Sequence, residues 1–518
     1  MKKAPKNWPP YLPVLTLQFY PFTSLLHKEV AVEGKFMAEK GSQGVSYTNV
    51  SSDYFDKRGL ERHAGLLALW GLGVAAVVSG DFSGWNFGIA EAGWGGLFIA
   101  TVLVIIMYYG MLFSIGEMAA ALPHTGGAYS FARSSMGPWG GFVTGFAETI
   151  EYVATTAVIV FFSASYADSI IKELFDLSMP VWAWWIILYA IFLLLNISGT
   201  ALSFKFAIWV SFITLGVIAL FTVMAVFSGK FSFDNLTNIA PEAGNSSFLP
   251  FGLWPIVAAM PFAMWFFLGI EELPLAAEEA HEPARDIPKA GIRGMATLVV
   301  TAMLVLVLNP GLTGAKELSE SGEPLLDGFR AILPNSDVAA LLAAFALVGL
   351  LASLQGIMFA YGRNIYSLSR AGYYPKVLSL TGSRKTPWTA LIAGAAIGYA
   401  ALLWAQYGGE SAGAVVLNIA VWGAVIAYML QMISYLMLKK KLPNLARPYK
   451  SPVGSMGAIV AGLLAALVFV GQALNPALTT AIQAIAIVYV IGLAGFGLFG
   501  RKKLVLSPEE QAAISGHK

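Results

Sequence analysis

The sequence has no cysteine and little charge. Of its 518 residues, 12% are charged and 57% are hydrophobic, whereas about 25% of the residues of an average soluble domain are charged. The absence of cysteine excludes disulfide bridges, thiolate metal sites and cysteine nucleophiles. The histidines lie outside the centres of the apolar runs, so we expect no metal site and no cofactor in the membrane; they are His27, His63, His124, His281 and His517. An ordinary soluble fold is also excluded.

Apolar runs follow one another along nearly the whole chain. About 20 residues are needed to cross the hydrocarbon core of a bilayer, and the chain contains about 12 such runs. We therefore predict an all-α polytopic membrane protein, with a membrane domain at 63–500 and tails at 1–62 and 501–518. The predicted spans cover residues 64–88, 93–121, 138–167, 181–198, 202–228, 252–276, 291–312, 338–369, 388–406, 412–438, 454–472 and 476–499.

Lys and Arg are distributed unevenly between the connections. The connections on one side, with their flanks, hold 21 of these residues, and the opposite side holds Lys172, Lys230, Lys316 and Arg330. Cytoplasmic loops of membrane proteins carry an excess of Lys and Arg. We expect both termini to lie on the cytoplasmic side of the cell membrane.

The first 62 residues contain neither a span nor a signal peptide. Their apolar stretch from Tyr11 to Leu26 is interrupted by Pro13 and Pro21, and no small-residue cleavage site follows. We predict a disordered cytoplasmic tail. We also hypothesise that Met37 is the native start, so that residues 1–36 are not native; an intact mass that includes them would contradict this.

Two spans contain residues that a lipid-facing helix does not tolerate. The first places Gly80, Asp81 and Gly84 at mid-membrane depth, and the sixth contains Pro261, then Gly269, Glu271, Glu272 and Pro274. A carboxylate at the bilayer centre costs about 2.5 to 3.5 kcal/mol on insertion scales. Unwound main chain is tolerated at this depth only where it lines a cavity. The alternative is that the glycines merely allow close helix packing.

These interruptions occupy the same position in two successive groups of five spans. Such a pair of interrupted spans indicates an inverted-repeat transporter whose site lies between the two breaks.

Several motifs resemble the amino acid-polyamine-organocation superfamily. They are EMAAALPHTGGAYSFAR from Glu117 to Arg133 with GPWGGF from Gly137, the segment from Ala277 to Pro288, and the segment from Arg363 to Pro375. The resemblance extends from Tyr54 to Arg501. It implies a LeuT-like fold with about 12 transmembrane helices, a 5+5 inverted repeat, two appended helices and broken helices 1 and 6.

Within the superfamily, the stretch SGDFSGWN from Ser79 to Asn86 resembles the ethanolamine permease branch. In amino acid carriers of this fold, main-chain amides of the first break hold the substrate carboxylate, as the positive end of a half-helix should. A carboxylate at Asp81 would repel that group and attract an ammonium. Ethanolamine is an amine without a carboxylate, so it suits this chemistry.

The candidate substrate site comprises the two breaks and one face of span three. Asp81 is the expected ammonium partner, although it could instead cap the second half-helix. Aromatic side chains beside the breaks could form a cation-π wall or serve only as packing. The residues at the breaks are Ser79, Gly80, Asp81, Phe82, Trp85, Phe266, Phe267, Gly269 and Glu271.

Span three carries Glu148, Glu151, Tyr152 and Thr155 on one helical face. These acids could neutralise a cationic substrate, carry a proton, or fix helix packing through hydrogen bonds. Glu271 is interpreted as a gating residue or a partner for a helix end. A network that closes the cytoplasmic gate is expected, with surface solvation as the alternative, from Glu117, Arg133, Glu278, Glu279 and Arg285.

The resulting hypothesis is a secondary transporter that imports ethanolamine or a close small amine by alternating access. The alternatives are an amino acid permease of the same superfamily and a membrane amine sensor that does not transport. An enzyme is not expected, and neither is a nucleic-acid partner. The coupling ion could be a proton or sodium. Span five offers no basic side chain from Phe206 to Gly229 that could replace a sodium ion, as a lysine does in some superfamily members.

Overall fold

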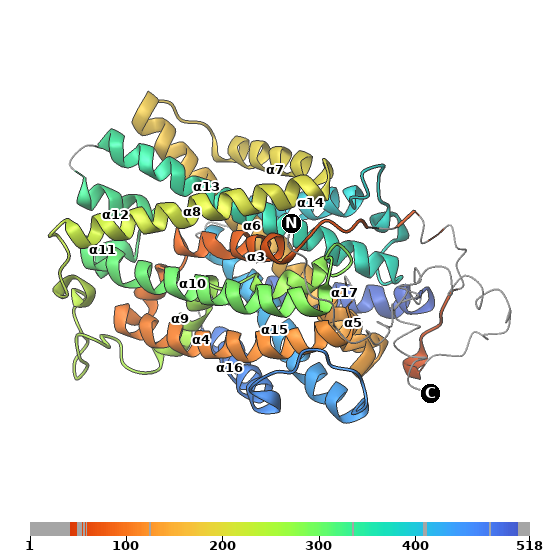
Figure 1. Cartoon of the computed structure of the whole chain (residues 1–518). Coiled ribbons are helices and arrows are strands. Elements are labelled where there is room, and N and C mark those ends of the chain that lie inside the picture. The colour runs from red at the N-terminus through yellow and green to blue at the C-terminus, as the bar shows by residue number, and fades with distance from the viewer. Residues whose placement is uncertain are drawn as a thin grey trace, which may run out of the picture.

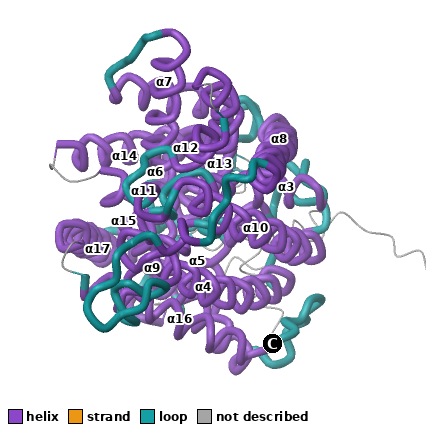
Figure 2. The backbone as a smooth tube through the Cα atoms, turned by 90° about the vertical axis from the view of Figure 1, so that its left-hand side faces the viewer, coloured by secondary structure: helices purple, strands orange, loops and turns teal. Residues whose placement is uncertain are grey.

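The computed structural model describes residues 42–48, 54, 57–58, 60–123, 126–333, 336–407, 412–475 and 478–505. The proposed start at Met37 lies outside these residues. Figure 1 shows a bundle of long helices that run side by side, and Figure 2 views the same bundle from its end.

The bundle contains long helices and a few short 3₁₀ segments, labelled η. In chain order the membrane helices and the segments between them are α3 (Leu66–Val77), η2 (Val78–Asp81), α4 (Phe87–Ala121), α5 (Gly127–Met136), α6 (Pro138–Phe175), α7 (Val181–Ile197), α8 (Thr200–Phe227), η3 (Asp234–Thr237), α9 (Pro255–Trp265), η4 (Ile270–Ala276), α10 (Pro283–Thr313), α11 (Ala315–Leu318), α12 (Pro324–Ile332), α13 (Ser336–Arg370), η5 (Lys376–Ser379), α14 (Trp388–Tyr407), α15 (Ala412–Lys441), α16 (Gly454–Leu474) and α17 (Thr479–Leu498). Short 3₁₀ segments at Ser42–Gly44 and Gly500–Lys502 lie before and after them.

The prediction of about twelve spans is confirmed. Among the described residues, nine helices are long and apolar enough to cross a membrane, and the bent pair α9 and η4 makes a tenth. Two shorter apolar helices, Leu66–Asp81 and Val181–Ile197, supply the remaining two segments. The third span is longer than predicted, because α6 continues to Phe175.

The predicted boundary between spans one and two coincides with a kink. Span two was predicted to begin at residue 93, and Gly93, with φ 69° and ψ 172°, separates two helical pieces within α4. Glycine tolerates this positive φ, so a kink takes the place of a longer loop.

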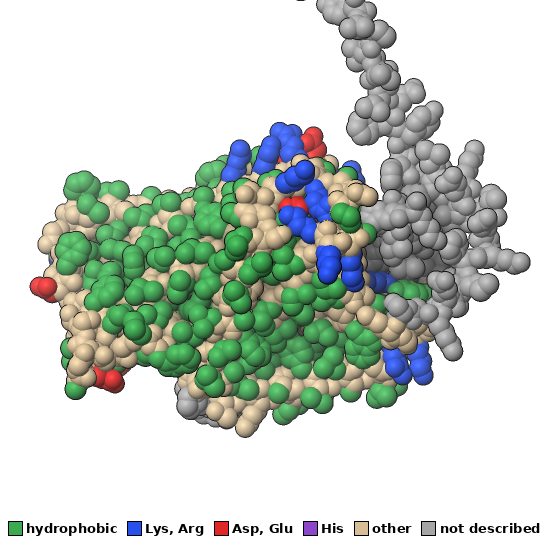
Figure 3. Space-filling view, turned by 90° about the horizontal axis from the view of Figure 1, so that it is seen from below, with side chains coloured by type: hydrophobic (Ala, Val, Ile, Leu, Met, Phe, Trp, Pro, Cys, Tyr) green, Lys and Arg blue, Asp and Glu red, His purple; other side chains and the backbone are tan. Residues whose placement is uncertain are grey.

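The surface of the bundle has an apolar belt and, apart from it, a basic end. Figure 3 shows hydrophobic side chains over the middle of one face and Lys and Arg gathered at one end, which we call the basic end. Exposed apolar residues such as Trp209, Leu463 and Ile491 have most of their surface outside the bundle. This is the distribution expected of helices that face lipid.

The disordered-tail prediction needs correction for the described residues before α3. Ser46 donates its amide hydrogen to the Arg501 carbonyl at 2.9 Å, and Thr48 to the Leu504 carbonyl at 2.7 Å. Tyr47 and Leu504 form a parallel bridge. The main chains of the two terminal segments thus satisfy each other's polar groups.

The helices α6 and α13 pack along each other, and α6 also packs along α15. The helix α3 packs between α8, α10 and α13. The appended helix α17 is mostly exposed, with only Ala481, Ile485 and Phe496 buried. The first interrupted span therefore lies inside the bundle, against three other helices.

Candidate functional site

The first break separates α3 and η2 from α4. The chain turns at residues 82–86, with Gly84 at φ 91°. Ser353 of α13 accepts the Ser79 amide hydrogen at 2.9 Å and donates its own hydroxyl hydrogen to the Ala75 carbonyl at 2.7 Å. Tyr166 of α6 donates to the Phe82 carbonyl at 2.7 Å. Side chains from two other helices thus satisfy the unwound main chain.

The second break separates α9 from η4, and the two elements meet at an angle of 41°. Gly269 has φ 112°, a conformation that L side chains rarely adopt. Its amide donates to Glu271 Oε2 at 3.1 Å. Glu271 therefore accepts a hydrogen bond from the amide that the break exposes. This agrees with the interpretation of Glu271 as a partner for a helix end. Pro261 lies inside α9 without interrupting it.

The two breaks are in direct contact. A methyl group at Gly80 would lie 2.3 Å from the Trp265 carbonyl oxygen and 2.9 Å from the Phe266 Cα atom. The Trp85 and Phe266 rings stack with their centroids 5.4 Å apart. The main chains approach so closely at this point that only glycine fits at position 80.

Asp81 is buried, with 1% of its surface exposed. Neither of its carboxylate oxygens has a hydrogen-bond partner of good geometry. The helix α4 begins after Asn86 without a side-chain cap, so Asp81 does not cap it. The Thr301 hydroxyl of α10 lies within reach of the Asp81 carboxylate. This carboxylate therefore lies at the first break, toward α10, without a positive partner among the described residues.

The acids of span three meet the second break. Glu151 and Glu271 lie within side-chain hydrogen-bond reach of each other. Tyr428 of α15 donates to Glu151 Oε1 at 3.0 Å, and its hydroxyl lies 3.2 Å from that of Tyr108 in α4. One oxygen each of Glu151 and Glu271 is buried without a hydrogen-bond partner. Two carboxyls in this arrangement can share a proton or face a cation.

Glu148 lies one helical turn before Glu151 and accepts a hydrogen bond from Asn364 of α13 at 3.2 Å. The hydroxyls of Tyr152 and Thr155 are buried without partners. Asp81 has no electrostatic contact with any of these glutamates. The structure thus brings Glu148, Glu151, Tyr152 and Glu271 together, and it holds Asp81 apart from them.

The predicted cytoplasmic network divides into separate groups. Glu278 forms a salt bridge with Arg370, and Glu279 forms one with Arg363. Arg133 donates to the Val505 carbonyl at 3.3 Å and lies near the Tyr47 and Tyr373 rings. Arg285 forms an exposed pair with Glu282.

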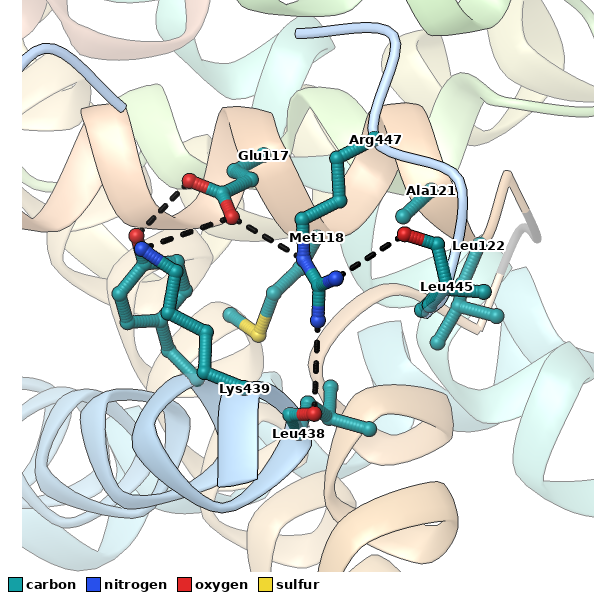
Figure 4. A pocket seen from close by; sticks show the side chains of 9 residues that line it. Glu117, Met118, Ala121, Leu122, Leu438, Lys439, Leu445 and Arg447 are labelled. Carbon is teal, nitrogen blue, oxygen red and sulfur yellow. Dashed lines mark hydrogen bonds and ion pairs between the residues drawn. The ribbon is translucent and has the colours of Figure 1, made fainter. Parts of the chain in front are cut away.

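Glu117 belongs to yet another group (Figure 4). Its carboxylate lies 3.1 Å from Arg447 Nε and 3.7 Å from Lys439 Nζ. It also accepts hydrogen bonds at 2.8 Å from the Tyr435 hydroxyl and the Ser451 amide. The adjoining pocket has a volume of about 10 Å³, too small for a substrate. Glu117 thus joins α4 to the connection between α15 and α16.

Several residues of this region are absent from the sequence-based site. Glu272 is buried with neither carboxylate oxygen hydrogen-bonded, and Arg363 is buried beside it. The hydroxyls of Tyr108, Tyr166 and Tyr428 reach the breaks or the glutamates from other helices. In the sequence, these residues could be noticed only as polar groups inside apolar runs, and that pattern does not show which residues they contact.

Burial raises the pKa of Glu279, which follows η4, and the positive charge of Arg363 opposes this effect. The carboxylate is thus retained in a buried position by its guanidinium partner.

Comparisons with known proteins agree on one family. The family model described as amino acid permease matches residues 66–507. The lysine-specific permease LysP of Lactococcus lactis is 26% identical, and the match covers 91% of this chain and 95% of that protein. A putative histidine permease of Bacillus subtilis is 25% identical over 85% of this chain and 94% of its own length. A probable GABA permease of Pseudomonas aeruginosa is 25% identical over 75% of this chain and 80% of its own length.

The fold resembles a solved membrane transporter. The crystal structure of an Eremococcus coleocola manganese transporter mutant matches with a TM-score of 0.54 and 17% identity, covering 87% of this chain and 98% of that one. This likeness concerns the fold alone. Together with the two breaks, it confirms the predicted 5+5 inverted repeat with broken helices 1 and 6.

Proposed function

Since the chain belongs to the amino acid permease family, and is therefore a secondary transporter, we propose that it imports ethanolamine or a close small amine. Substrate binds where the two broken spans meet, and access alternates between the two sides of the membrane. In this proposal the basic end lies in the cytoplasm, because cytoplasmic connections carry the excess of Lys and Arg.

The unpartnered carboxylate of Asp81 is the observation that carries the proposal. A buried carboxyl without a basic partner is costly, so its presence at the first break favours a role in binding a cation. A substrate ammonium at this position would supply the missing charge and hydrogen bonds. The substrate carboxylate of an amino acid would be repelled there.

The wider surroundings of the breaks are also acidic. Asp81, Glu148, Glu151, Glu271 and Glu272 are all buried. The positive charge of Arg363 interacts with one of them, Glu272, but Arg363 forms its ion pair with Glu279. A site lined by this many carboxyl groups suits a cationic substrate, a coupling cation or a proton better than an anion.

Glu151 and Glu271 are the proposed ion-coupling groups. Their carboxyls face each other, and each retains an oxygen without a partner. Either a proton or a sodium ion satisfies this arrangement, and imposed gradients of each ion distinguish them. The aromatic rings of Trp85 and Phe266 are proposed to form one wall of the substrate site.

An amino acid is the second candidate substrate, because three relatives are described as lysine, histidine and GABA permeases. In that case the substrate's amino group would face Asp81 and its carboxylate would need a donor elsewhere. Main-chain amides of the breaks are the available kind of donor.

Competition in proteoliposomes decides between the candidates. Purified protein is reconstituted, unlabelled ethanolamine is placed inside, and uptake of labelled ethanolamine is followed. We expect propanolamine and choline to compete more strongly than alanine or serine. Much stronger competition by alanine or serine would overturn the amine proposal and favour the amino acid. An absence of labelled ethanolamine uptake would overturn the amine proposal, and uptake of labelled alanine or serine would then support the amino acid.

A further inference from the structure

The deepest ion pair at the basic end joins α13 to the loop that follows η4. Arg363 donates from Nε to Glu279 Oε2 at 3.0 Å and from Nη2 to Glu279 Oε1 at 2.9 Å. The two side chains expose 1% and 0% of their surface. The guanidinium also lies over the Phe359 ring at 3.6 Å. This bidentate pair fixes the loop against α13.

The same loop holds the chain that leads into α3. The Glu279 carbonyl accepts the amide hydrogens of His63 at 2.8 Å and Ala64 at 2.9 Å, and the Ala64 carbonyl accepts that of His281 at 2.8 Å. The Glu279 side chain and main chain therefore join three elements at the basic end. Access to the breaks from this end requires these contacts to separate.

A second buried carboxyl, that of Glu272, lies within electrostatic reach of the same arginine. Glu272 is buried, with 1% of its surface exposed, and neither of its carboxylate oxygens has a hydrogen-bond partner. The positive charge of Arg363 attracts the Glu272 carboxylate, and Arg363 Nη1 has no hydrogen-bond partner. The arginine thus has an unused donor, and the glutamate has unused acceptors, within one buried cluster.

The two glutamates lie at different distances from the hinge between α9 and η4. Gly269, at φ 112°, lies at the bend between the two elements. Glu272 follows it by three residues and Glu279 by ten. A rotation of η4 about Gly269 displaces Glu279 much further than Glu272. The loop can therefore withdraw from Arg363 while Glu272 remains near.

We propose that Arg363 exchanges its carboxylate partner during transport, from Glu279 when the basic end is closed to Glu272 when it is open. Without Glu272, opening would leave the guanidinium without a carboxylate partner, which is unfavourable. Glu272 is a positioning residue in this scheme and does not touch the substrate. The inference rests on the family's transport activity but not on the identity of the substrate.

The absence of cysteine provides a direct test. Ala64 is fully buried and contributes only main-chain bonds to the closed loop, so Ala64→Cys reports separation of the loop. The reporter protein, solubilised in detergent without substrate, is treated with a hydrophilic maleimide, and the rate of alkylation is measured. This readout is independent of ethanolamine, so it can succeed or fail separately from the substrate proposal.

Two substitutions, each of which replaces a carboxylate by a neutral amide, should change the alkylation rate in opposite directions. Glu279→Gln weakens the closed state, so alkylation should accelerate about tenfold. Glu272→Gln weakens the open state, so alkylation should slow about threefold or more. The double variant should react more slowly than Glu279→Gln alone. A structural role for both residues would accelerate alkylation in both variants.

Glu282→Gln is the matched control, because Glu282 lies on the same loop in an exposed pair with Arg285. Its alkylation rate should equal that of the reporter protein. Thermal unfolding shows which variants are folded. If Glu272→Gln does not fold, Glu272→Asp retracts the carboxylate and should also slow alkylation. An unchanged or faster rate in the folded Glu272 variant would overturn the proposal.

Discussion

In the first broken span the main chain is held by side chains from other helices, whereas in the sixth it is held largely by its own residues. Ser353 and Tyr166 reach the first break from α13 and α6. Glu271 binds the Gly269 amide two residues earlier in the same segment. The first break is therefore tied to the position of two other helices. The segment η4 instead carries its own cap, so the main chain of the second break depends less on the position of other helices.

The contact between the breaks is the feature most sensitive to change. We expect Gly80→Ala to abolish uptake and to lower the free energy of unfolding by about 1 to 3 kcal/mol, because the new methyl group overlaps the Trp265 carbonyl. Uptake into proteoliposomes and thermal unfolding in detergent measure the two effects.

Gly216→Ala is the control for this change. Gly216 lies in α8 with nothing within 4 Å of an added methyl group, and alanine favours a helix over glycine by up to about 1 kcal/mol. This variant should unfold no more easily than the original protein. Normal uptake by Gly80→Ala would show that the breaks do not need to touch.

The carboxylate of the first break has the next largest expected effect. Asp81→Asn should reduce uptake about a hundredfold or more while the protein still inserts and folds, because the substrate ammonium loses its charged partner. Asp234→Asn, an exposed change in η3, should have no effect. Near-normal uptake by Asp81→Asn would remove Asp81 from substrate recognition.

The carboxylate of the second break should matter for coupling more than for stability. In Glu271→Gln the amide oxygen can still accept the Gly269 hydrogen, but the charge that faces Glu151 is lost. We expect gradient-driven accumulation to fall about tenfold, with exchange and thermal unfolding close to normal. The exposed change Glu320→Gln is the control. An equal loss of exchange would assign Glu271 to substrate binding instead.

The smallest effect is expected for the hydroxyl that supports the first break. Ser353→Ala removes an acceptor for the Ser79 amide and a donor to the Ala75 carbonyl. It should lower the free energy of unfolding by about 1 to 3 kcal/mol. The exposed Ser198 bonds to its own helix, and Ser198→Ala should cost less. Equal stability of the two variants would mean that the first break does not depend on α13.

The positions of the spans and their interruptions could be predicted because both are local properties. A run of about 20 apolar residues spans the bilayer whatever its neighbours are, and glycine, proline or an acid within it disrupts the helix directly. The boundary at Gly93 was located, but residues 89–92 are helical, because a kinked helix and a short loop have the same composition. The ordered segment at 42–48 was missed because its partner, 501–505, is far away in the chain.

The sequence assigned candidate site residues to the breaks and to span three, but it could not give their partners. Glu148 and Glu151 share a helical face in the sequence, and the structure adds Glu271 and Tyr428 from other helices. Asp81, assigned to the same candidate site, has the Thr301 hydroxyl of α10 within reach. The orientation of a side chain around an unwound segment follows no fixed period, so no sequence pattern reports it.

By itself, the sequence determined a membrane-spanning bundle, the location of its two breaks and the strong asymmetry of its basic residues, because length, composition and helix-breaking residues act locally. Only the tertiary structure decided that Arg363 pairs with Glu279, 84 residues away, that Glu117 pairs with Arg447 and Lys439, and that Glu272 has no hydrogen-bond partner. An ion pair requires two charges within a few ångströms of each other, and only the packing of distant helices determines that distance.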